Sequence, residues 1–185
     1  MQSSSESSST AFDLPIELDA FHHVNLRKAY IYALQESDDN VTMNGSLLFR
    51  PGAGALLGSA NKYPNNLTVL PHMRERPSKY DYIVCAERNL IYESSKKGIS
   101  ANGCVLYCPF VACPECAKAI VQSGVTKVVG HENIMNIIPE RWFDRIAIGL
   151  DILRQGNVEV VLWKGKCFER KEDFKISFDG KDFYP

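Results

Sequence analysis

Two stretches of the chain decide the fold: residues 85–89, CAERN, and residues 106–124, LYCPFVACPECAKAIVQSG. The residue patterns predict a helix over residues 85–97, an apolar strand within 103–111 and a second helix over 113–123. Both helices begin at a cysteine. The N-termini of the two helices should therefore point toward a common site.

Outward from this centre the chain continues to alternate between strand and helix patterns. Strand–helix–strand order implies parallel strands covered by helices, and an upstream hairpin adds two antiparallel strands. The sequence thus predicts an α/β protein of three layers, α-β-α, in which a five-stranded mixed sheet carries helices on both faces. The further elements are strands at 46–49, 55–57, 125–129 and 158–163, and helices at 140–155 and, with Pro15 in its first turn, at 16–35.

The chain divides into three parts of unequal character. Residues 1–11 are rich in serine and predict a disordered tail. Residues 12–165 predict one domain, which contains a long loop, 61–78, of the kind that often carries function. Residues 166–185 form a polar extension with four phenylalanines, expected to pack on the body or on a neighbouring subunit.

Composition sets limits on partners and on location. The 185 residues are 45% hydrophobic and 23% charged, with a net charge of -1, which argues against binding to long nucleic acid. There is no apolar run long enough for a membrane span, and the start of the chain does not resemble a secretory signal. A cytoplasmic location follows as an expectation. In that reducing compartment the six cysteines indicate metal binding or chemistry more than disulfides.

Three cysteines have the spacing of metal ligands. Cys113 and Cys116 are three residues apart and so share one helix face, and Cys85 begins the other helix. Helix N-termini favour thiolates, zinc binds thiolates strongly, and three protein ligands leave a fourth position open for water. The alternative is a closed structural site completed by Cys104 or Cys108. Otherwise these two, like Cys167, are expected to be small buried side chains.

Glu87 lies two residues after the first of these cysteines. A carboxylate in this place can take a proton from a zinc-activated water and pass it on. The alternative is an ordinary acid in the first turn of a helix, which is how we interpret Glu115. The four histidines lack ligand spacing to the cysteines and are expected at the surface or in the core: His22, His23, His72 and His131.

Residues 85–89 and 106–124 resemble the zinc-dependent cytidine and deoxycytidylate deaminases, whose signature is three His or Cys ligands with a glutamate that is not a ligand. Residues 58–64, GSANKYP, resemble the G-x-N loop of the same family. The resemblance implies a cytidine-deaminase-like fold and Zn²⁺ on the three cysteines, with Glu87 as catalytic acid and base. It further implies that the Ala86 amide binds the base carbonyl, that Asn61 holds the sugar, and that Arg88 offsets thiolate charge.

Two positions depart from the family pattern. Cys85 stands where deoxycytidylate deaminases normally have histidine, and C-A-E-R is typical of tetrameric cytidine deaminases; Ala112 stands where proline is usual. Residues 116–118, CAK, and the ending at residues 122–125, QSGV, resemble deoxycytidylate deaminases more closely.

The resemblance therefore implies deamination of dCMP to dUMP and ammonia by a homo-oligomer. The alternatives are a cytidine or deoxycytidine deaminase, a tRNA adenosine deaminase, and a non-catalytic zinc-binding subunit. The candidate phosphate partners, which could equally be solvated charges, are Lys62, Arg74, Arg76 and Lys79.

Overall fold

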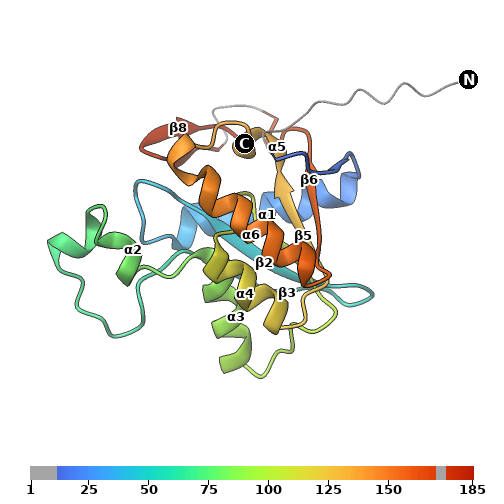
Figure 1. The fold of residues 1–185 in the computed structure, drawn as a ribbon, viewed down its shortest axis with the longest axis horizontal. Coiled ribbons are helices and arrows are strands. Elements are labelled where there is room, and N and C mark those ends of the chain that lie inside the picture. Colours follow the sequence, from blue (N-terminus) through green and yellow to red (C-terminus); the bar gives the residue numbers. More distant parts are fainter. Residues whose placement is uncertain (1–11, 170–173) are drawn as a thin grey trace, which may run out of the picture.

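The computed structural model describes residues 12–169 and 174–185, so the predicted tail, residues 1–11, lies outside the described part. A sheet forms the centre of the molecule (Figure 1). It has six strands in the order β1-β6-β5-β4-β2-β3. The strands β1, β6, β5 and β4 run parallel, and β2 pairs antiparallel with β4 and β3. Their bounds are β1 (Ile16–Glu17), β2 (Gly45–Arg50), β3 (Gly54–Ala60), β4 (Val105–Tyr107), β5 (Lys127–His131) and β6 (Glu159–Trp163).

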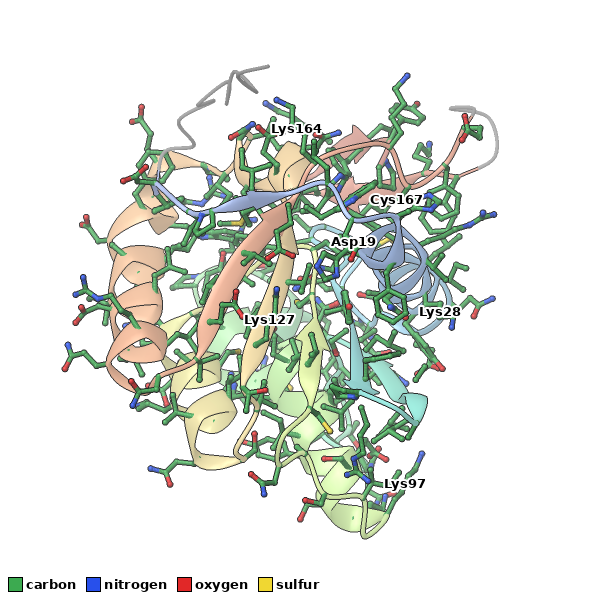
Figure 2. All side chains as sticks on the ribbon, turned by 90° about the vertical axis from the view of Figure 1, so that its right-hand side faces the viewer. Asp19, Lys28, Lys97, Lys127, Lys164 and Cys167 are labelled. Atoms are coloured by element: carbon green, nitrogen blue, oxygen red, sulfur yellow. The ribbon has the colours of Figure 1, made fainter. Side chains whose placement is uncertain are left out.

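Helices cover both faces of this sheet, which confirms the predicted three-layer α/β architecture. One face is covered by α1 (Ala20–Glu36); the other is covered by α3 (Ala86–Lys96), α4 (Pro114–Gln122) and α6 (Phe143–Gln155), as Figure 2 shows from the side. The short helices are α2 (Lys79–Tyr82), α5 (Glu132–Met135) and two 3₁₀ turns, Pro71–Arg74 and Glu140–Trp142. Within the described residues, no helix has both the length and the apolar character needed to cross a bilayer.

The prediction of five strands was wrong by one strand at the sheet edge. Residues 16 and 17, predicted to begin the first helix, form β1 beside β6, where the Pro15 carbonyl accepts a hydrogen bond from the Leu162 amide at 2.8 Å. The helix begins only after Asp19, whose carboxylate caps the Phe21 amide at 2.8 Å. A two-residue strand is too short to show an alternating pattern. Asp19, a typical N-cap residue, was the better indicator of where the helix begins.

Helix α1 packs unusually close to the sheet. Its buried residues Leu26, Ala29, Tyr30 and Ala33 follow helical spacing and face β2. A side chain at Gly45, the first residue of β2, would meet the carbonyl oxygen of Ala29 at 2.0 Å. The glycine therefore allows the close approach, and it fixes the position of the chain that enters β2.

The C-terminal extension packs on the body of its own chain, one of the two arrangements left open by the sequence. Residues 176–178 (β7, Ile176–Phe178) and 181–183 (β8, Lys181–Phe183) form a separate hairpin. Ile176 joins the core beneath α1, and Phe178 joins the core on the opposite side of the sheet. The hairpin is tied to residues 41–43 by hydrogen bonds from Met43 N to Ser177 O at 2.8 Å and from Gly180 N to Val41 O at 2.8 Å.

A buried histidine makes the stability of the fold depend on pH. His131 is fully buried, with Nδ1 2.6 Å from the Tyr30 hydroxyl and Nε2 3.0 Å from the Gly165 carbonyl. Burial lowers the pKa of His131 to about 4, below its ordinary value of 6.5. The unfolded chain therefore takes up a proton between these values while the folded chain does not, so stability falls as the pH falls through this window.

We expect this one group to lower the free energy of unfolding by about 2 kcal/mol between pH 7.5 and pH 5. His131→Gln, which can accept from Tyr30 and donate to Gly165, should lack this contribution. Urea denaturation of both proteins at the two pH values measures it, because other titrating groups cancel in the difference. An equal pH dependence in the two proteins would contradict the prediction.

Candidate active site

The starts of α3 and α4 bring three cysteine side chains together. Cys85 is the N-cap of α3, Cys113 is the N-cap of α4, and Cys116 lies in the first turn of α4. The three sulfur atoms all lie within 4.8 Å of one another, and those of Cys113 and Cys116 are 3.4 Å apart. The structure thus brings together the three residues that the spacing predicted as metal ligands.

Neighbouring elements hold the two helix starts in place. The Ser46 hydroxyl of β2 donates to the Ala86 carbonyl at 2.8 Å, which fixes the start of α3 against the sheet. On the other side, α6 passes so close that a side chain at Gly149 would meet the Ala112 carbonyl at 2.1 Å. The cluster is therefore built on rigid elements.

Glu87 is buried beside the cysteines, with only 2% of its surface exposed. Its Oε2 atom finds no hydrogen-bond partner among the described residues. Burial, reinforced by the negative charge of Cys113, raises the pKa of Glu87 to about 7. A carboxyl group of this kind can both hold and release a proton near neutral pH, which an exposed first-turn acid cannot do.

Arg88, expected to offset thiolate charge, lies near the sulfur cluster. Its guanidinium lies 3.9 Å from the Cys85 sulfur, and its Nε is buried with no partner in the described residues. Burial by itself lowers the pKa of Arg88, but the negative charge of Cys116 and Cys85 outweighs burial and raises it above its ordinary value. Arg88 is therefore a permanent positive charge beside the thiols.

The donor set fits a zinc ion with three protein ligands. Hydrogen bonds from Cys116 and Cys85 lower the pKa of Cys113 far below its ordinary value, so one thiolate is already favoured without any metal. Three close sulfur atoms, together with a buried carboxylate oxygen that has no partner in residues 12–169 and 174–185, match an open site in which a water completes the fourth position.

The remaining cysteines lie outside the sulfur cluster. Cys104, Cys108 and Cys167 are buried at 0%, 0% and 1% exposure, as expected for small core side chains. The Cys108 sulfur donates to the Phe110 carbonyl at 3.3 Å and accepts from the Asn44 amide at 3.2 Å. Within residues 12–169 and 174–185, neither Cys104 nor Cys108 joins the three clustered sulfurs, which argues against a closed four-cysteine site.

The cluster opens into a cavity of about 500 Å³, the size of a small-molecule site. Phe110 and Trp142 line one wall and stack on each other, with ring centroids 4.9 Å apart and planes 22° apart. Phe178 from the C-terminal hairpin supports Phe110 edge-on at 5.3 Å. This flat apolar wall suits a planar base.

Arginines contribute to another part of the cavity lining. Arg76 and Arg141 both line it, and both donate to one oxygen of Asp179 at the tip of the β7–β8 hairpin, Arg76 at 2.6 Å. Arg145 also lines the cavity. Sequence reasoning singled out Arg76 but missed Arg141 and Arg145, because nothing in an isolated helix start indicates which cavity it borders.

The other candidate phosphate partners are engaged elsewhere. Lys62 pairs with Glu36 at 2.6 Å and lies outside this cavity, and Arg74 lies over the Tyr63 ring at 5.5 Å. Lys79 lines the cavity but forms a buried ion pair with Asp39 at 2.7 Å.

Asn61 and Ala86, the predicted substrate contacts, both line the cavity. Ala86 begins α3, where a backbone N–H has no partner within the helix and is available to a ligand. Thr42 and Asn44 line the cavity as well, and no pattern in the sequence pointed to either residue.

Residues 31–132, more than half of the chain, match the family model described as the cytidine and deoxycytidylate deaminase zinc-binding region. The chain belongs to this family. The match confirms the family that the sequence resembles and the assignment of zinc as cofactor, since the sulfur cluster lies within the matched residues.

Curated relatives carry deaminase names. An uncharacterized deaminase of Aliivibrio fischeri is 29% identical over 124 residues, which is 67% of this chain and 81% of that protein. The human deoxycytidylate deaminase is 30% identical over 107 residues, 55% of this chain and 58% of the human protein. The phage T4 deoxycytidylate deaminase is 38% identical over 76 residues, 40% of this chain and only 35% of the phage protein. The chain is thus confirmed as a deoxycytidylate-deaminase-like enzyme at the level of family.

Solved structures agree on the fold. The dCMP deaminase of cyanophage S-TIM5, crystallised in complex with dCMP and dUMP, superposes with a TM-score of 0.62 at 23% identity and covers 79% of this chain and 99% of that chain. At this identity the likeness supports the deaminase fold.

Proposed function

We propose that the protein converts dCMP and water to dUMP and ammonia. The observation that carries this proposal is the buried Glu87 carboxylate, whose Oε2 has no partner among the described residues, beside three clustered cysteines at a cavity of about 500 Å³. The names of the curated relatives support deoxycytidylate as the substrate.

Cys85, Cys113 and Cys116 would hold the zinc ion, which when bound supplies a water acidic enough to ionise near neutral pH. Glu87 moves the protons. In the reaction the water oxygen forms a bond to C4 of the base, and the C4–N4 bond breaks. Glu87 carries one water proton to N3, where it remains in the product, and the other to the departing amine. The Ala86 amide would bind the base carbonyl.

Arg88 would offset the charge of the metal centre. Three thiolates outweigh the two positive charges of zinc, which would make the bound water a weaker acid than in a site with a neutral histidine. The Arg88 guanidinium, 3.9 Å from the Cys85 sulfur, supplies the missing positive charge. This pairing gives a physical reason for Cys85 and Arg88 to occur together.

The rest of the cavity suits a nucleoside monophosphate. The stacked rings of Phe110 and Trp142 offer a surface for the base. Arg76 and Arg141 use one nitrogen each on Asp179, so each guanidinium retains further donors for a phosphate group. Each such charge-assisted bond contributes about 1.5–3 kcal/mol.

The test is ammonia release by the zinc-loaded protein from cytidine, deoxycytidine, CMP, dCMP and dCTP. We expect dCMP to exceed deoxycytidine in kcat/KM by at least about tenfold, since one or two phosphate bonds are worth that much. Arg76→Gln and Arg141→Gln should each lower this ratio several-fold, because the loss falls on the phosphate.

Arg74→Gln is the matched control, because Arg74 lies over Tyr63 and outside the cavity. It should keep the ratio of the unchanged protein. A protein that prefers the nucleoside would instead be a cytidine or deoxycytidine deaminase, and release of ammonia from tRNA adenosine alone would make it a tRNA deaminase. Homo-oligomer formation, a cytoplasmic location and the absence of long nucleic-acid partners stay predictions from sequence.

A further inference from the structure

Two side-chain oxygens in the cavity wall lack the partners that burial demands. Thr42 and Asn44 line the cavity and are only 6% and 7% exposed, yet Thr42 Oγ1 and Asn44 Oδ1 have no hydrogen-bond partner among the described residues. A polar group buried in this way destabilises a protein unless water or a ligand satisfies it. Both oxygens therefore need a partner that the described residues do not supply, and a ligand in the cavity that Thr42 and Asn44 line could supply it.

The Asn44 side chain is fixed in orientation. Its Nδ2 donates to the Phe110 carbonyl and to the Cys108 sulfur, both at 3.2 Å. Because a carbonyl oxygen can only accept, the amide cannot turn over without losing the first of these bonds. Asn44 Oδ1 is thus a hydrogen-bond acceptor in a fixed orientation. The hydroxyl of Thr42, two residues earlier, can either donate or accept.

Asn61, expected to hold the sugar, uses its side-chain hydrogen bonds to hold this wall of the cavity in place. Its Oδ1 accepts from the Ser37 hydroxyl at 2.7 Å and from the backbone N–H of Asn44 at 3.0 Å, and its Nδ2 donates to the backbone carbonyl of Thr42 at 2.9 Å. Both lone-pair directions of the oxygen are therefore in use. Asn61 thus positions residues 42 and 44, and its described hydrogen bonds use one of the two Nδ2 hydrogens.

The charge around this wall selects the kind of ligand group. Asp39 accepts from the Thr42 amide at 3.2 Å and holds Lys79 in a buried ion pair, so this wall presents a neutralised pair. A negatively charged phosphate is better matched by the positive charges of Arg76 and Arg141, which also line the cavity. A neutral group that can donate to Asn44 Oδ1, such as a hydroxyl, matches Thr42 and Asn44.

We propose that Thr42 and Asn44 bind the 3′-hydroxyl of the substrate's sugar. The proposal rests on the proposed function, because dCMP supplies one free sugar hydroxyl, the 3′-hydroxyl. Loss of that hydroxyl would leave the Asn44 acceptor buried and unpaired, which is a larger penalty than loss of an exposed bond.

The experiment compares dCMP with 2′,3′-dideoxycytidine monophosphate, which lacks the hydroxyl. Binding is measured by calorimetry on the zinc-loaded Glu87→Gln protein, so that no turnover occurs. We expect dCMP to bind at least about tenfold more tightly than the dideoxy compound, and we expect this factor to fall below about threefold when Thr42→Val or Asn44→Val is added. Thr42→Val is nearly isosteric and keeps the Thr42 backbone bonds, so it serves if Asn44→Val does not fold.

Thr68→Val, the same change in an exposed loop threonine outside the cavity, should keep the tenfold factor. An unchanged factor in Thr42→Val and Asn44→Val, or equal binding of the two nucleotides by the parent protein, overturns the proposal. Ammonia release by the protein with native Glu87 is measured separately. Hydroxyl-dependent binding without deamination of dCMP would refute the proposed function and leave this inference standing.

Discussion

Replacing Glu87 by glutamine is expected to lower kcat for dCMP by roughly 10²- to 10⁴-fold, the usual contribution of general acid–base catalysis. The zinc content should stay at one ion per chain, because the three cysteines supply the ligands. Glutamine has the size of glutamate and can still hydrogen-bond, but it cannot accept and return a proton. The effect should therefore appear in kcat and much less in KM.

The site explains why Glu87 can perform both proton transfers. Burial and Cys113 raise its pKa to about 7, so the protonated and ionised forms are both accessible near neutral pH. Glu115 gives a matched control in the first turn of the neighbouring helix. Glu115 lines the same cavity, but its side chain is 50% exposed and pairs with Lys118 at 2.7 Å, so Glu115→Gln should change kcat by less than about twofold.

Steady-state kinetics and elemental analysis of the two variants test this assignment. Full activity in Glu87→Gln would refute the proton-transfer role. A metal-free Glu87→Gln protein would instead show that Glu87 is a zinc ligand.

The part of the molecule that could be predicted from sequence is the part governed by local spacing. Cys113 and Cys116 lie one helical turn apart, and Cys85 and Glu87 lie at the start of the preceding helix, so local spacing places each pair on a helix start, and the alternation of helix and strand predicts that the two starts meet. Alternation of strand and helix patterns likewise predicted the layers. The extra strand β1 was not predicted, because two residues cannot show an alternating period.

The substrate-facing residues could not be predicted in the same way. Arg141 and Asp179 meet across 38 residues, and Asn61 meets Ser37 across 24, through contacts that depend on how loops cross the sheet edge. Lys62 and Lys79 have the right chemistry for phosphate, yet each finds a carboxylate, Glu36 or Asp39, that no local pattern connects to it. Charge alone therefore cannot assign a binding role within a long loop.

The second large effect concerns the metal ligands. Cys116→Ala should reduce the zinc content from one ion per chain to nearly none and abolish ammonia release, because two thiolates and a water hold zinc far more weakly than three thiolates. When the free zinc concentration is about 1,000 times the dissociation constant, zinc binding stabilises the folded chain by about 4 kcal/mol. A strong chelator should therefore lower the Tm of the unchanged protein and leave that of Cys116→Ala where it is.

Cys108→Ala is the control that distinguishes an open site from a closed one. Cys108 is as buried as Cys116 and lies eight residues before it, but its sulfur is engaged by Asn44 and Phe110 and lies outside the sulfur cluster. Cys108→Ala should thus keep one zinc ion, the chelator-sensitive Tm and the ability to release ammonia, although the lost contact to Asn44 can raise KM. Loss of zinc from Cys108→Ala would mean that a fourth thiolate closes the coordination sphere. With no position left for water, the chain would then be a zinc-stabilised subunit without catalysis, and the role assigned to Glu87 would fail with it.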